Sequence, residues 1–202
     1  MLSNRTRILT AILMPVLLFL TACGINSIPT AEENAKAKWA DVQNYYQRRA
    51  DLIPNLVATV QGYANQERNV LTAVTEARAS ATRVTVSPDQ LTDPAAMQRF
   101  AEAQGRLSQA IIPLQRLQEN YPELHSNENF MALQSQLEGT ENRIAVARRD
   151  YNQAVQEYNT TIRTFPDAIG AKIFYGAKPK VPFEASPTAQ NAPPVNFGNM
   201  AG

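Results

Sequence analysis

The sequence predicts an all-α protein, an antiparallel up-and-down bundle of three to four long helices. Three observations support this. Hydrophobic residues make up 44% of the 202-residue chain, while glycine and aromatic residues are few, a balance that favours helices over sheets. Apolar residues recur at alternating spacings of three and four, as in helices that pack side by side. Short proline-containing segments separate these stretches, so successive helices should run in opposite directions.

The first helical stretch should span residues 31–82. A helix of this length is too long to pack as one straight rod in a small bundle. We therefore expect it to fold back near residues 62–66, which gives a fourth helix. Its inward positions are Trp39, Val42, Tyr46, Arg49, Ile53, Leu56, Val60 and Tyr63, followed by Val70, Val74, Ala77 and Ala81.

Two further helical stretches should follow a loop at residues 84–95. Asp93 and Pro94 predict the start of the second stretch, because aspartate caps helices and proline is tolerated at the first helical position. Ser126 or Asn127 should cap the third stretch, and Phe165-Pro166 should end it. The inward positions are Phe100, Ala103, Leu107, Ala110, Leu114, Leu117 and Tyr121 in the second, and Phe130, Leu133, Leu137, Thr140, Ile144, Ala147, Tyr151, Ala154, Tyr158, Thr161 and Phe165 in the third.

The N-terminus has the layout of a secretory signal, with two arginines, an apolar run at residues 8–20 and small residues before Cys23. Leu20-Thr21-Ala22-Cys23 resembles the lipobox of bacterial lipoproteins. We therefore predict a signal peptide at 1–22 and a lipidated tether at 23–30, with the lipid on Cys23, the only cysteine. The alternative is an uncleaved N-terminal helix as the membrane anchor.

The C-terminal segment, residues 171–202, is rich in proline and should lack regular structure. Ile173, Phe174, Tyr175 and Phe183 could fix its first part to the end of the bundle domain, which we place at 31–170. Beyond residue 185 we expect disorder.

The sequence offers no recognisable set of catalytic or metal-binding residues. It has a single histidine, His125, and no motif for nucleophilic catalysis, zinc or phosphate binding. A net charge of +1 gives no field to attract nucleic acid. We therefore expect no cofactor, no metal, no nucleic-acid partner and no enzyme activity, with a hydrolase that uses Glu138 and Glu141 as the less favoured alternative.

The stretch QRRADLIPNL, residues 47–56, places a charge at an inward position. A buried arginine needs a carboxylate, because an unpaired buried charge is costly. Glu138 and Glu141 are the best candidates to pair with Arg49, with Asn142 in support. The alternative is that Arg49 extends past the edge of the inward stripe into water.

Pro54, next to Asn55, lies within the same helical stretch. The inward positions keep their spacing across Pro54, which favours one kinked helix over a new helix capped by Asp51. The carbonyl of Ala50 then loses its N–H partner and should find another polar group. The candidate structural or interaction residues are Arg49, Pro54, Asn55, Glu138, Glu141 and Asn142.

Three segments closely resemble the LemA family: NYYQRRADLIPNLVATVQGYANQERNVLTAVTEARA (44–79), LQSQLEGTENRIAVARRDYNQAVQEYNTTIRTFP (133–166) and FYGAKPKVPFEA (174–185). The resemblance covers roughly residues 35–185. It implies a four-helix bundle beside a membrane, held by one N-terminal membrane segment, on the extracytoplasmic side. It implies no activity and no catalytic residues. A lipobox in place of a plain membrane span departs from that pattern.

The function that best fits these features is an envelope protein that binds another envelope protein or forms a homo-oligomer. Gly24, rather than aspartate, after the cysteine favours an outer-membrane lipoprotein facing the periplasm, by resemblance to lipoprotein sorting rules. The alternative location is the inner membrane. A bundle that carries a lipid or small ligand in a cavity between its helices is the second functional hypothesis.

Overall fold

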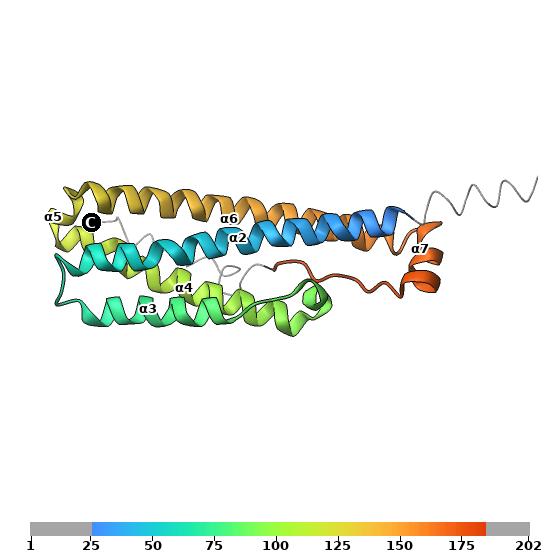
Figure 1. Ribbon diagram of the computed structural model, residues 1–202, viewed down its shortest axis with the longest axis horizontal. Helices are drawn as coiled ribbons and strands as arrows, with labels where there is room; N and C mark the ends of the chain where they lie inside the picture. Colours follow the sequence, from blue (N-terminus) through green and yellow to red (C-terminus); the bar gives the residue numbers. More distant parts are fainter. Residues whose placement is uncertain (1–25, 185–202) are drawn as a thin grey trace, which may run out of the picture.

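Among residues 26–184, which this computed structural model describes, four long helices carry the fold. They are α2 (Ser27–Gln61), α3 (Arg68–Arg83), α4 (Pro94–Asn120) and α6 (Glu128–Thr161). No strand occurs in this part of the chain. Helices α2 and α6 lie side by side along the whole length of the bundle, and α3 and α4 form a second, shorter pair (Figure 1). The predicted all-α bundle is therefore confirmed.

Shorter helices close the two ends of the bundle. The 3-10 helix η1 (Pro88–Thr92) precedes α4, and α5 (Pro122–His125) joins α4 to α6. At the opposite end, α7 (Asp167–Gly170) continues into a π-helix, η2 (Ala171–Tyr175). From Gly176, which has a positive φ of 54°, residues 176–184 run back along the bundle without regular structure (Figure 1). We call this segment the C-terminal strap.

The chain folds back between α2 and α3 where the sequence predicted. Helix α2 ends at Gln61 and α3 begins at Arg68, on either side of the expected bend. Ala64 is buried inside this turn, whereas Tyr63 is exposed. The inward stripe of α2 therefore ends at Val60, and its expected continuation to Tyr63 is wrong. The residues after Val60 have left the helix and no longer follow its period.

Helix α2 starts earlier than predicted. Residues 27–30, expected to be part of a tether, form its first turn, and Thr30 Oγ1 donates a hydrogen bond to the carbonyl of Asn26 at 2.7 Å. Ile28 is buried in a small apolar cluster with Tyr158, Ile162 and Ala171. Burial of this side chain explains why the helix extends so far. The predicted signal peptide, Cys23 and the tail beyond residue 184 lie outside the described residues.

The predicted N-cap residues Asp93 and Asn127 begin helices α4 and α6. The side chain of Asp93 accepts a hydrogen bond from the amide of Ala95 at 2.9 Å, and Asn127 accepts one from the amide of Phe130 at the same distance. Helix α6 ends at Thr161, however, and Phe165 is exposed. The expected inward position of Phe165 is therefore wrong, because the helical period stops four residues before it.

The interior consists of two large apolar clusters. One, towards α5, consists mainly of aliphatic residues such as Leu56, Leu107 and Leu137. The other is aromatic and surrounds Trp39 and Phe100. Arg49 and Gln104 are buried at the level where the two clusters meet. A polar layer thus divides the core, and polar layers of this kind can fix which side chains face each other in a helical bundle.

Candidate functional site

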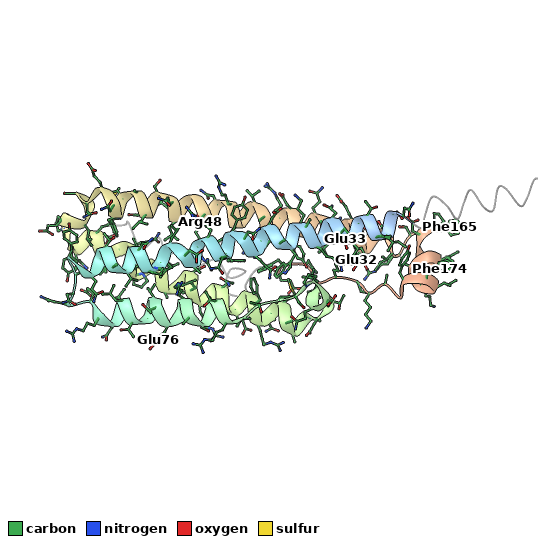
Figure 2. All side chains as sticks on the ribbon, viewed as in Figure 1. Glu32, Glu33, Arg48, Glu76, Phe165 and Phe174 are labelled. Carbon is green, nitrogen blue, oxygen red and sulfur yellow. The ribbon has the colours of Figure 1, made fainter. Side chains whose placement is uncertain are left out.

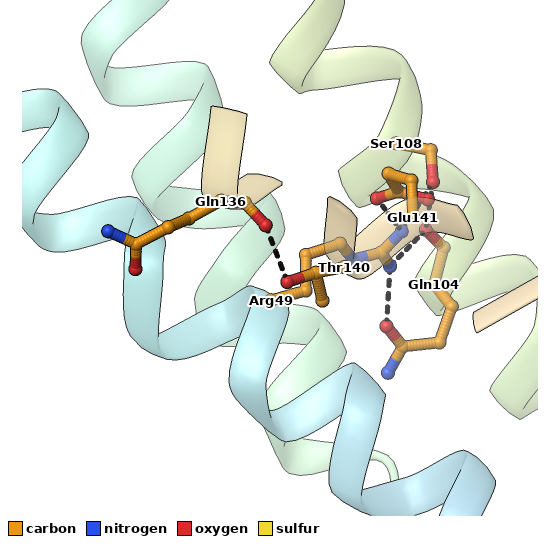
Figure 3. A network of polar contacts seen from close by, with 6 residues as sticks. All are labelled: Arg49, Gln104, Ser108, Gln136, Thr140 and Glu141. Atoms are coloured by element: carbon orange, nitrogen blue, oxygen red, sulfur yellow. Dashed lines mark hydrogen bonds and ion pairs between the residues drawn. The ribbon is translucent and has the colours of Figure 1, made fainter. Parts of the chain in front are cut away.

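The side chain of Arg49 forms the centre of the polar layer. It is 1% exposed and donates four hydrogen bonds to residues of α4 and α6. Nη1 bonds Glu141 Oε1 at 2.9 Å and Ser108 Oγ at 2.7 Å. Nη2 bonds the carbonyl and the side-chain oxygen of Gln104 at 3.1 and 2.8 Å (Figure 3). A single side chain from α2 therefore ties α4 and α6 together.

The two partners of the Arg49–Glu141 ion pair are buried to different extents. The guanidinium is fully buried, whereas the Glu141 side chain remains 42% exposed. Most of the cost of burying Arg49 must therefore be offset by neutral acceptors and by the ring of Tyr46, whose centroid lies 5.0 Å from Cζ. Arg49 Nε has no partner among the described residues. The expectation that Arg49 pairs with a carboxylate across the bundle is confirmed.

Other predicted partners of Arg49 lie elsewhere. Glu138 is exposed and accepts a hydrogen bond from Gln134 at 3.4 Å, and Asn142 is exposed. Positions 138 and 142 lie on the solvent side of α6, because only every third or fourth residue of a helix faces inward. Their expected contact with Arg49 is therefore wrong. Thr140, which precedes Glu141, is buried, but its hydroxyl donates to the carbonyl of Gln136 (Figure 3).

Pro54 lies inside α2 and does not end it. The carbonyl of Ala50, which would otherwise lack a partner, accepts a hydrogen bond from Arg78 Nε of α3 at 2.7 Å. The expected continuous helix and the expected polar partner are both confirmed. Asn55 is exposed, and its carbonyl accepts a hydrogen bond from the hydroxyl of Thr59 at 2.9 Å. Asn55 therefore belongs to the solvent face of α2.

A groove opens beside Arg49 because α4 and α6 stand apart. Helix α2 packs along α6, α3 along α4, and α2 against α3, but the backbones of α4 and α6 approach each other far less. The groove has a volume of about 660 Å³. Tyr46 and Arg49 of α2 also line it. Burial raises the pKa of Tyr46 further above neutrality.

Both walls of the groove combine apolar and polar residues. Helix α4 contributes Met97, Ala101 and Gly105, which are apolar or small, and helix α6 contributes Ile144 and Arg148. Arg106 and Glu102 of α4 and Glu141 of α6 also face it, so charges of both signs border an apolar interior. The volume and this mixture are typical of binding sites for small ligands or peptide segments.

The C-terminal strap closes one end of the groove and is held by the side chains of α6. Asn159 exchanges two hydrogen bonds with the backbone of Lys180, both at 2.8 Å. Asn152 does the same with Phe183, at 2.9 and 2.6 Å. The two asparagines are two helical turns apart, about 10 Å, which matches three residues of extended chain. The strap therefore binds in register with the helix.

Phe183 anchors the strap in the aromatic cluster. Its ring lies 6.2 Å from that of Trp39, 6.3 Å from that of Tyr46 and 6.2 Å from that of Phe100. The guanidinium of Arg148 lies over the same ring at 4.4 Å and donates to the carbonyl of Glu184. Of the predicted tail contacts, Phe183 is confirmed. Ile173 and Phe174 are exposed and lie outside the core clusters, and Tyr175 is also exposed.

Lys180, in the middle of the strap, is buried. Its ammonium bonds Glu32 at 3.1 Å and lies 4.8 Å from the centroid of the Tyr158 ring. Burial alone would raise the pKa of Glu32, but the hydrogen bond and charge of Lys180, together with Lys36, outweigh it and lower that pKa. The strap thus carries an apolar anchor and a charged one.

Gln104, Ser108 and the two asparagines were not identified from the sequence. Gln104 could have been found, since it lies four residues after Phe100 and three before Leu107, on the inward face. Asn152 and Asn159 share one face of α6, but only the structure shows that the strap reaches them. Within residues 26–184, three potential metal-ligating side chains never gather, and no helix is both long and apolar enough to cross a membrane.

The sequence is similar to those of several known proteins. The chain is 26% identical over 157 residues to the magnetosome proteins MamQ 1 and MamQ 2 of Paramagnetospirillum magneticum, and 25% identical to MamQ of Magnetospirillum gryphiswaldense. Each alignment covers 70% of this chain but 58% of the relative. A family model for the LemA family matches residues 38–197, which is most of the chain. The chain therefore belongs to the LemA family.

Proposed function

We propose that this protein is a membrane-anchored interaction module of the bacterial envelope without a catalytic role. The observation that carries the proposal is the groove between α4 and α6, whose floor is a guanidinium fixed by four hydrogen bonds. A rigid floor favours binding, because little conformational entropy is lost when a partner arrives. The partner is another envelope protein or a second copy of this chain.

The strap supports an extended peptide as the bound element. Side chains of α6 bond the backbone of Lys180, Val181 and Phe183 and thereby hold a chain that has no regular structure of its own. Glu184, where the described strap ends, lines the groove. A peptide segment of a partner would lie beyond it between the same two helices, with an apolar side chain beside Met97 and Ile144.

Attachment to a membrane is the second part of the proposal. Membership of the LemA family and similarity to magnetosome proteins support a membrane-associated helical protein. The lipobox-like residues before Cys23 support a lipid anchor, in the outer membrane facing the periplasm, with an uncleaved helix in the inner membrane as the alternative. Replacing Cys23 with serine should abolish fatty acylation. A variant that stays acylated and membrane-bound at full size would refute the lipid anchor.

The absence of a catalytic role rests on the two carboxylates that could have served a hydrolase. Glu141 is engaged by Arg49, and Glu138 is exposed on the solvent side of α6. General acid-base catalysis by a pair of carboxylates needs both to reach one substrate. The positions of Glu138 and Glu141 therefore support binding rather than hydrolysis.

A lipid or small apolar ligand is a second candidate for the groove. Its volume of about 660 Å³ lies within the range of ligand sites, roughly 300–1,000 Å³, and Tyr46, Met97, Ile144 and Phe183 supply apolar contacts. Native mass spectrometry of protein purified from cells tests this candidate. A discrete bound mass that is lost when Gly105, which lines the groove, is replaced by arginine would favour a small ligand over a peptide.

Photo-crosslinking in cells tests the interaction module directly. A photoreactive amino acid replaces Gln98, which lines the groove, or Glu76, which is exposed on α3 and serves as the control (Figure 2). We expect a discrete crosslinked species from position 98 and none from position 76. Mass spectrometry then identifies the partner, and mixing isotopically labelled and unlabelled chains identifies a homo-oligomer. Equal labelling from both positions would contradict the proposal.

A further inference from the structure

One end of the bundle exposes a group of apolar side chains that the core does not use. Phe165, Ile169, Ile173 and Phe174 are 76, 53, 68 and 69% exposed. They lie on α7, on η2 and on the turn before them, and the two labelled phenylalanines, Phe165 and Phe174, both lie at this end of the molecule (Figure 2). We call these four residues the apolar tip. Large apolar side chains gathered on a surface mark a contact with a partner or a membrane.

The apolar tip lies where the N-terminal segment joins the bundle. Helix α2 begins beside α7 (Figure 1), and a Cβ atom placed on Gly170 would lie 3.8 Å from Cδ1 of Ile28. The 25 residues before the described chain therefore connect to this end. They contain the apolar run at residues 8–20 and Cys23. Cys23 is three residues before Asn26, so a lipid on Cys23 would be joined to this end by at most about 10 Å of chain.

The charges around the apolar tip favour an anionic surface. Arg163, Lys172 and Lys178 are exposed in this part of the chain, and Asp167 is the single acidic residue between positions 163 and 178. Exposed aromatic and aliphatic side chains flanked by cations are the composition of segments that lie in the interface of a bilayer. Basic groups near the headgroups are attracted by anionic lipids.

We propose that the apolar tip inserts into the interfacial region of a phospholipid bilayer, as a membrane contact additional to the N-terminal anchor. The long axis of the bundle then points away from the membrane, and the strap and groove are held at a defined distance from it. The proposal rests on the membrane attachment proposed above. Its test separates the two, because insertion of the tip is read by a local probe and attachment by flotation.

Tryptophan fluorescence provides the local probe. Trp39 is the only tryptophan of the sequence and is buried, so a second tryptophan reports on its own position. Phe174→Trp places the probe in the apolar tip. Tyr63→Trp, at an exposed aromatic position in the turn between α2 and α3 at the opposite end, is the matched control. Both full-length proteins are reconstituted into vesicles of phosphatidylethanolamine and phosphatidylglycerol, with or without brominated acyl chains.

We expect the emission of Phe174→Trp to shift to shorter wavelength on reconstitution and to be quenched by brominated lipid, while Tyr63→Trp changes in neither respect. Flotation of both variants with the vesicles confirms attachment. If both float but their spectra respond alike, the anchor stands and the tip does not insert. If neither floats, both proposals are wrong. A short-wavelength emission of Phe174→Trp already present without vesicles would show that protein covers the tip, and would also overturn insertion.

Discussion

At the scale of single residues, Arg49 shows how one polar side chain can be stable inside an apolar core. Its guanidinium is buried but meets Glu141, Ser108 and two oxygens of Gln104. Each hydrogen bond to a charged group contributes roughly 1.5–3 kcal/mol, and together they offset the loss of hydration. Arg49 therefore selects one arrangement of α2, α4 and α6 more than it adds net stability.

This account predicts an unequal effect of two substitutions at Arg49. Arg49→Ala leaves a cavity and deprives four acceptor atoms of their donor, and should lower the free energy of unfolding by about 3 kcal/mol. Arg49→Leu fills part of the space, and Glu141 can turn to solvent, so its cost should be about half as large. Urea denaturation of both variants measures this, with Arg48→Leu, an exposed neighbour, as the control. Equal losses for alanine and leucine would contradict the account.

Glu32 and Lys180 supply a pH-dependent contact between α2 and the strap. Because the pKa of Glu32 is lower in the folded protein than in the unfolded chain, the contact stabilises the fold above the unfolded value. That stability is lost as pH falls through the folded value. We expect Glu32→Gln to destabilise the protein at pH 7 and the difference from wild type to shrink as the pH falls below the usual range of a glutamate.

Urea denaturation at several pH values checks this expectation. Glu33→Gln is the matched control, because Glu33 is the adjacent residue, is largely exposed and bonds Lys36 in an exposed pair. Exposed pairs contribute little to stability. A difference between wild type and Glu32→Gln that persists unchanged over the whole acid range in which the protein stays folded would show that the charge of Glu32 is not what fixes Lys180.

At the scale of elements, Pro54 is tolerated because another helix replaces the hydrogen bond that it removes. Arg78 of α3 donates to the carbonyl of Ala50, the group that residue 54 would otherwise have bonded. The proline thus turns an internal bond of α2 into a bond between α2 and α3. The sequence predicted the free carbonyl, but it did not identify the donor, because 28 residues and a turn separate the two positions.

A double-mutant cycle tests this exchange. Arg78→Met should lower the free energy of unfolding by about 1–2 kcal/mol in the wild-type background, since a buried carbonyl loses its partner. In a Pro54→Ala background the restored N–H of residue 54 can bond Ala50, so the same substitution should cost less than half as much. Thermal or urea unfolding of the four proteins gives the coupling. Equal costs in both backgrounds would mean that Pro54 and Arg78 act independently.

The strap is the element that the sequence described least well. Its prolines predicted the lack of regular structure, and Phe183 was among the expected contacts. The sequence could not show that Asn152 and Asn159 bind its backbone, because hydrogen bonds from a side chain to a backbone leave no pattern in the bound segment. The expected packing of Ile173 and Phe174 was wrong for a related reason, since composition does not distinguish a core contact from a surface one.

At the scale of the whole molecule, periodicity predicted three long helical stretches, because the inward stripe repeats over many turns. The length of the first stretch predicted the turn between α2 and α3, and with it the fourth helix. Periodicity also placed Arg49 in the core. It did not predict the groove, since periodicity assigns residues to the inside of a bundle but not to a particular pair of helices. The separation of α4 from α6 depends on how all four helices and the strap pack together.

The groove and the apolar tip lie on different parts of the bundle. The tip and the start of α2 occupy one end, and the groove lies along the side of the bundle, next to the strap. With the tip at a membrane, the groove faces sideways, open to a partner in the surrounding compartment. This arrangement suits a protein that holds a binding surface at a fixed height above a bilayer.

The most direct test of the central claim, that the groove binds a partner, uses two glycines. Gly105 lines the groove on α4, Gly139 lies outside it on α6, and a Cβ atom at either position would meet nothing within 4 Å. Arginine at each position should therefore preserve the fold and slightly favour its helix. The yield of the complex crosslinked from position 98 in cells should fall at least tenfold with Gly105→Arg and stay unchanged with Gly139→Arg. An unchanged yield with Gly105→Arg, in a protein that is still folded, would contradict the claim.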